Sequence, residues 1–220
     1  MILTLQILQV SLFAIPVLVL IVLGLVILLR PVAVINRRWL LLTFLPLLVA
    51  NLLAIFTNDT ANGIAVLPDW SFWANVAVDL ALAAGISFWL RGVAVYGLPL
   101  TVVETLCRDA LVGQGIEVSA RIGEKRTLLT TERQATIFTV VVGGKEEEIW
   151  LTSRTGEVVI QADSAQGRAL AKQVIPILRN HQAPYAFQHH AVGILYLVLA
   201  AVLLVFGWIY FFEPRLVIVE

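Results

Sequence analysis

Four long apolar runs constrain this chain more than any other feature of its sequence. They lie at about residues 11–29, 39–56, 72–90 and 191–211. A helix needs roughly 20 mainly apolar residues to cross the hydrocarbon core of a bilayer, and each run comes close to that length. The composition, with 60% hydrophobic and 14% charged residues, also lies outside the range of soluble globular proteins. The sequence therefore predicts an α-helical polytopic membrane protein with four transmembrane helices.

The distribution of arginines predicts the orientation of these helices. Arg37 and Arg38 lie between the first two runs, whereas the segment between the second and third runs contains two aspartates and no Lys or Arg. Cytoplasmic loops carry the excess of basic residues, so we expect the first loop to be cytoplasmic. Arg91, directly after the third run, agrees. Both termini should then lie outside, and we expect the bacterial inner (plasma) membrane as the location.

The start of the chain bears on whether the first run is kept. Its first ten residues contain no Lys or Arg, whereas a cleavable secretory signal begins with a basic segment. We therefore interpret the first run as a retained transmembrane helix.

A polar segment at residues 98–186 separates the third run from the fourth. Its first part, at about residues 99–112, has apolar residues at helical spacing, and a second helix should follow Asp163 or Ser164. Alternating apolar residues predict four strands between them, at about residues 116–122, 135–142, 148–152 and 157–161. The segment should thus be a small cytoplasmic α+β domain, an antiparallel meander flanked by two helices. It divides the chain into residues 1–97 with three transmembrane helices, the domain at 98–186, and residues 187–220 with the fourth helix and a short outer tail.

Asp79 is the most distinctive polar residue, because it lies near the middle of the third run. A carboxylate at that depth costs several kcal/mol unless it is protonated or paired. Asn51 in the second run should lie at a similar depth, and Asn75 and Ser87 fall on the same side of the helix as Asp79. These four residues form the predicted intramembrane polar site. We favour a role in helix packing, with Asp79 bonded to Asn51, over a proton-titrating or ion-binding role.

His189 and His190 come just before the fourth run, and Arg37 and Arg38 follow the first run. All four residues should lie at the predicted cytoplasmic interface of the membrane. Imidazoles at this level could ligate a metal or a pigment. Adjacent helical residues point about 100° apart, however, so the two histidines cannot chelate one ion. We therefore interpret these four residues as interfacial anchors and expect no metal site.

The remaining features limit the functions that the chain can have. Fifteen basic and fifteen acidic residues cancel, so nucleic acid is not an expected partner. The one cysteine, Cys107, excludes a disulfide within the chain. The sequence contains no cofactor motif, so it leaves the identity of any cofactor unknown. We expect a non-catalytic accessory or scaffold subunit in the lipid bilayer, whose cytoplasmic domain binds a protein partner or a second copy. The alternatives are a proton- or ion-coupled transport or channel component using Asp79 and, less favoured, a membrane enzyme or cofactor site using His189 and His190.

Overall fold

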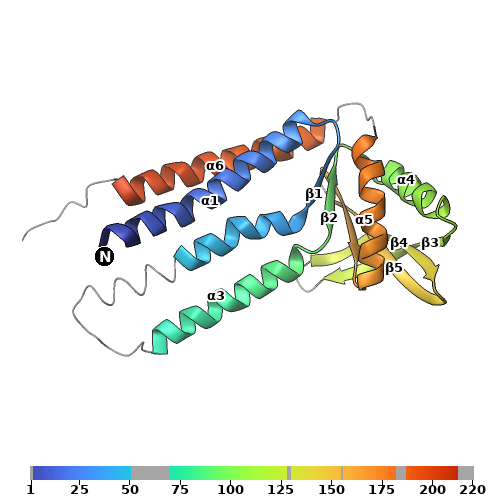
Figure 1. Ribbon diagram of the computed structural model, residues 1–220, viewed down its shortest axis with the longest axis horizontal. Helices are drawn as coiled ribbons and strands as arrows, with labels where there is room; N and C mark the ends of the chain where they lie inside the picture. Colours follow the sequence, from blue (N-terminus) through green and yellow to red (C-terminus); the bar gives the residue numbers. More distant parts are fainter. Residues whose placement is uncertain (1, 51–69, 128–129, 155, 182–186, 213–220) are drawn as a thin grey trace, which may run out of the picture. The chain divides into compact units, whose positions relative to one another are not determined.

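The computed structural model describes residues 2–50, 70–127, 130–154, 156–181 and 187–212 (Figure 1). The chain forms two compact units, which we describe separately. The first unit contains Met1–Gly24, Arg38–Leu90 and Leu195–Glu220, and the second contains Leu25–Arg37 and Arg91–Ile194.

The first unit is almost entirely helical in its described part. Its elements are most of α1 (Ile2–Leu29), part of the 3-10 helix η1 (Arg37–Leu40), the helical residues 41–50, α3 (Trp70–Trp89) and most of α6 (Phe187–Phe212). Helices α1 and α6 lie side by side (Figure 1), and Val17, Leu20 and Ala200 form their buried contact. Gly207 of α6 lies against the ring of Phe13, where a Cβ atom would collide with that ring. A small residue at this position lets the two helix backbones approach closely.

The prediction of four transmembrane helices is wrong for the part of the chain that the structure describes. Two helices there are long and apolar enough to cross a membrane, through Val10–Leu29 of α1 and His190–Ile209 of α6. The apolar part of α3 is limited to Trp73–Ser87, which spans about 22 Å at 1.5 Å per residue and falls short of the roughly 30 Å of hydrocarbon. Of the run predicted at 39–56, residues 51–56 lie outside the described residues.

A six-stranded antiparallel sheet forms the centre of the second unit. Its strands follow the order β1-β2-β6-β5-β4-β3. Their bounds are β1 Ala33–Asn36, β2 Val93–Tyr96, β3 Glu117–Thr127, β4 Thr130–Val142, β5 Lys145–Arg154 and β6 Glu157–Ala162. Strands β3 to β6 make a simple meander, in which each strand pairs with the next. Strand β2 then pairs with β6 and β1, which makes β3 and β1 the two edges of the sheet.

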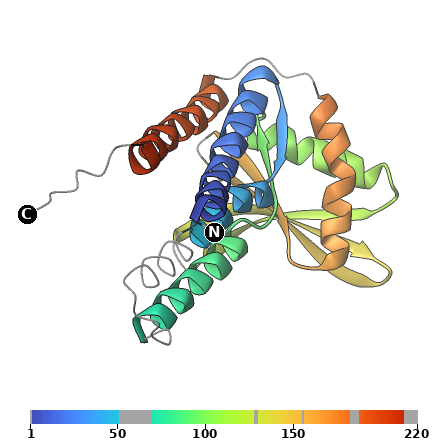
Figure 2. The ribbon, with the colours of Figure 1, turned by 60° about the vertical axis from the view of Figure 1, so that its left-hand side comes forward.

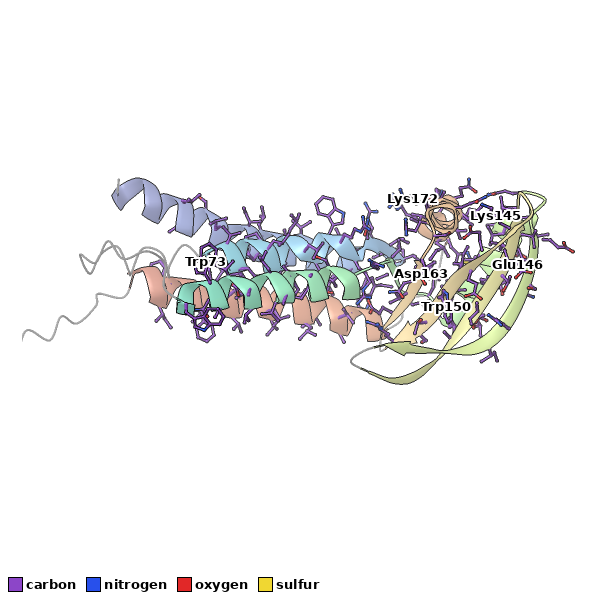
Figure 3. All side chains as sticks on the ribbon, turned by 90° about the horizontal axis from the view of Figure 1, so that it is seen from below. Trp73, Lys145, Glu146, Trp150, Asp163 and Lys172 are labelled. Carbon is purple, nitrogen blue, oxygen red and sulfur yellow. The ribbon has the colours of Figure 1, made fainter. Side chains whose placement is uncertain are left out.

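Helices α4 (Leu100–Val112) and α5 (Ala165–Asn180) cover one face of this sheet, as Figures 1 and 2 show. The strand residues on that face include Phe138, Ile149 and Leu151, which pack with Cys107 and Leu111 of α4 in one buried core. Residues at alternate positions point to the opposite face. Trp150 of β5 is one of them and lies on the side away from α5 in Figure 3.

The sheet has two more strands than the sequence predicted, and both lie outside residues 98–186. Strand β1 follows α1 after three residues, and β2 follows α3 after a similar interval. Each is a segment of only four residues beside a long apolar helix, which is too short to show the alternation that identifies a strand. Gly92 and Gly97 bracket β2 with φ angles of 100° and 89°, a conformation that glycine adopts without strain. A tight change of direction at each end therefore lets β2 enter the sheet.

The predicted helices of the second unit are present with small differences at their ends. Ser164 caps α5, because its Oγ accepts a hydrogen bond from the backbone N of Gly167 at 2.8 Å. Pro176 lies inside α5, which continues past it to Asn180. Pro176 lies on the exposed side of α5, where solvent can hydrate the carbonyl group that loses its helical partner.

Candidate functional site

Asp79 lies in α3 and is buried, with 8% of its surface exposed. Asn75, one turn earlier, is exposed, and Ser87, two turns later, is half-buried. Asn51, the predicted partner of Asp79, lies outside the described residues. The structure thus places one carboxyl group in a protected position on an apolar helix, and its pairing with Asn51 stays a prediction.

The four predicted interfacial residues differ in their environments. Arg37 begins η1 and is 4% exposed, and its backbone N donates a hydrogen bond to the carbonyl of Gly92 at 3.2 Å. Arg38, the next residue, is exposed. His189 and His190 belong to the first turn of α6, which begins at Phe187, and the side chain of His190 is half-buried. Arg37 is thus buried at the end of β1 while Arg38 is exposed, and the role of these residues as interfacial anchors stays a prediction.

An apolar groove of about 460 Å³ lies between α1 and α6. Its lining is Val10, Phe13, Ala14, Ile15, Val17, Leu18, Ile21, Leu204, Gly207 and Trp208. These side chains contain no titratable or nucleophilic group, so the groove suits a hydrocarbon chain or another apolar side chain and cannot by itself supply acid–base chemistry.

The clearest surface for a protein partner is the outer edge of strand β3. We define the β3 edge as Glu117–Gly123, the part of β3 whose exposure is described. β3 is the last strand of the sheet, so one side of its backbone is left without a neighbouring strand of the sheet. Free N–H and C=O groups along an edge strand can pair with a strand from another chain. Ile122 on this edge is 81% exposed. An apolar side chain exposed to this extent is one that a binding partner would cover.

An ion pair supports the β3 edge from the face of the sheet opposite to the helices. The Nη2 atom of Arg121 lies 2.6 Å from Oε1 of Glu148 on β5, which spans the intervening strand β4. Both side chains are exposed, so the pair contributes little to stability, about 0–1 kcal/mol. It does hold the Arg121 side chain over β4. Sequence reasoning identified the strand and missed its edge position, because alternation within one strand does not reveal the order of pairing.

Cys107 is buried in the core beneath α4, and its thiol is held in the neutral form. Burial, with a smaller contribution from the nearby carboxylate of Glu104, raises the pKa of Cys107 to about 12. Glu104 itself accepts a hydrogen bond from the hydroxyl of Thr136 on β4. A thiol with this pKa is a poor nucleophile at neutral pH, since the thiolate is the reactive form. Cys107 therefore acts as a small core residue.

The described residues contain no group of three or more His, Cys, Asp or Glu side chains placed to hold a metal ion. No protein-family model matches the sequence, and comparisons with curated proteins and with solved structures gave no significant match. The functional assignment therefore depends on the geometry of the chain itself.

Proposed function

We propose that this protein is a membrane-anchored, non-catalytic accessory or scaffold protein whose α+β unit binds a partner through the β3 edge. The observation that carries this proposal is the combination of an open edge strand with an apolar side chain, Ile122, that is 81% exposed on it. Strand addition would use the backbone groups of the edge for affinity and the side chain of Ile122 for specificity.

Membrane anchoring is supported by the two apolar helices that flank the second unit along the chain. Helix α1 leads into β1, and α6 follows α5. Arg30 and Arg91 lie where the chain passes from α1 and α3 into the second unit, and a concentration of arginines favours the cytoplasmic side. We propose that α1 is retained as an anchor, that the second unit is cytoplasmic and that both termini lie outside, as in a bacterial inner membrane protein.

A site-specific photo-crosslink tests the partner proposal. A photoreactive residue at Ile122 should give a discrete adduct in intact cells, because the partner would cover this side chain. The matched control is Val112, which is also apolar and exposed at 54% but lies at the end of α4. An adduct twice the chain mass of 24.2 kDa would identify a second copy, and another mass would identify a different protein. Equal adducts at both positions, or none at Ile122, would contradict the proposal.

The buried carboxyl group of Asp79 favours a second candidate function, that of a component in proton- or ion-coupled transport. Replacement by asparagine keeps the shape of the side chain and removes its titration. If Asp79→Asn keeps the folded yield and the complex mass but abolishes proton or ion flux in reconstituted vesicles, the transport function is supported. A loss of folded yield or complex mass would instead assign Asp79 to helix packing, the role that we favour.

A further inference from the structure

Helix α5 carries a line of positive charge along one side. Its basic residues are Arg168, Lys172 and Arg179, and the helix contains no acidic residue. At 100° per residue these three side chains fall within about 40° of one another around the helix axis. All three are exposed, and Lys172 is labelled in Figure 3. The line is therefore a cationic surface and not part of the core, which lies on the side of Leu170, Val174 and Leu178.

The C-terminal end of α5 lies beside the point where α1 joins the second unit. Leu178 of α5 and Val32, which directly precedes β1, belong to the same buried core. Arg30, two residues before Val32 and one after the end of α1, is exposed. Helix α5 contacts β1, and Figures 1 and 2 both show the C-terminal end of α5 beside the start of β1. The segment that contains Arg30 and the end of α5 that contains Arg179 therefore lie at the same end of the unit.

The connection from α5 to α6, the second apolar helix, is short along the chain. Asn180 ends α5 and Phe187 begins α6, so the intervening chain can extend at most about 25 Å. Helix α6 thus follows α5 after a short connection along the chain. Arg168, at the other end of α5, is engaged differently, because its guanidinium donates to the carbonyl of Asp163.

We propose that Arg30, Lys172 and Arg179 form a binding surface for the phosphate headgroups of anionic lipids. The surface rests on the proposed anchoring of the protein in a membrane. Arginine binds phosphate oxygens through paired N–H donors. Each basic residue near an anionic leaflet raises the affinity of the protein surface for that leaflet about fivefold at low ionic strength. The contact would fix α5 against the membrane surface.

Hydrogen–deuterium exchange of the full-length protein in nanodiscs tests this surface. Exchange in the C-terminal half of α5 should be slower, by about tenfold or more, in discs that contain phosphatidylglycerol than in discs of phosphatidylcholine alone. The difference should disappear in the R30Q/K172Q/R179Q variant and at high salt, which screens the charges. The control is Arg108→Gln, which removes one exposed charge from α4 and should leave the difference unchanged.

Several results would overturn the proposal. Equal exchange of α5 in the two kinds of disc would show that the surface does not face lipid, and protection that needs a copurifying acidic protein would assign the surface to that protein. A loss of the difference in Arg108→Gln would show a general charge effect. Labelling of Cys107 would reveal whether the triple variant is misfolded. In that case, the proposal would be refuted if the difference in α5 exchange between the two kinds of disc, measured on the native protein, did not depend on salt. Release of the protein by alkaline carbonate would instead refute the membrane anchoring itself.

Discussion

The core of the second unit can be tested by replacing Phe138 with alanine. Phe138 is fully buried on β4, in the core shared with α4 and α5. In the sheet it lies opposite Ile149 of β5 and Ala120 of β3. Removal of the ring leaves a cavity beneath the helices, because these neighbours belong to hydrogen-bonded strands and cannot move far to fill it.

The expected loss is about 4 kcal/mol, within the range of 3–5 kcal/mol for truncation of a buried Phe to Ala. A folded unit of about 120 residues has a free energy of unfolding of roughly 6–18 kcal/mol. The variant should therefore stay folded in most molecules. Its opening equilibrium should rise on the order of a thousandfold, since each 1.4 kcal/mol changes an equilibrium about tenfold.

Cys107 provides the assay, because it is the one cysteine of the chain and lies 3% exposed in the same core. A maleimide reagent labels this thiol when the core opens, so the labelling rate of the full-length protein in detergent reports the opening equilibrium. The rate should rise on the order of a thousandfold in Phe138→Ala. Val141→Ala on the same strand is the control, since Val141 is 45% exposed and its truncation should change the rate by only about twofold.

Two results would refute this reasoning. Native-like labelling in Phe138→Ala would mean that the ring does not hold α4 on the sheet. Equal acceleration in both variants would mean that labelling depends on strand β4 in general and not on the buried core.

Three further changes test other parts of the second unit. Burial raises the pKa of Cys107 from 9.0 to about 12. The contribution of its neutral thiol to the free energy of unfolding should therefore be complete below pH 9 and disappear as the pH approaches 12. Comparison of the native protein with Cys107→Ala in urea unfolding isolates this contribution. Gly97→Ala should destabilise the unit by about 2 kcal/mol or more, since φ is positive at this position and the new Cβ meets the carbonyl of Pro31. Gly144 also has a positive φ but open space around it, so Gly144→Ala should cost less. Equal losses of stability in the two variants would refute the steric argument. Ser164→Ala should cost about 1 kcal/mol through loss of the α5 cap, and an unchanged unfolding midpoint would contradict that role.

The α+β character of residues 98–186 could be predicted because its signals are local. Leu170, Val174 and Leu178 repeat at helical spacing along α5, and the glycines at 143 and 144 mark the turn between β4 and β5. The candidate site could be predicted much less well. Asp79 was identified from its apolar surroundings in the sequence, but the exposure of Ile122 depends on β3 lying last in the sheet, which no local pattern encodes.

Local patterns were enough to predict the apolar helices α1 and α6, the four-strand meander and the helices α4 and α5, because each follows from the composition or periodicity of one segment. Which strands complete the sheet and which charges share a surface depend on the folded chain. Short segments such as β1 and β2 acquire their place through hydrogen bonds to strands distant in the sequence. Val32, close to Arg30, and Leu178, beside Arg179, belong to one buried core, and burial of that kind depends on contacts that only the folded chain creates.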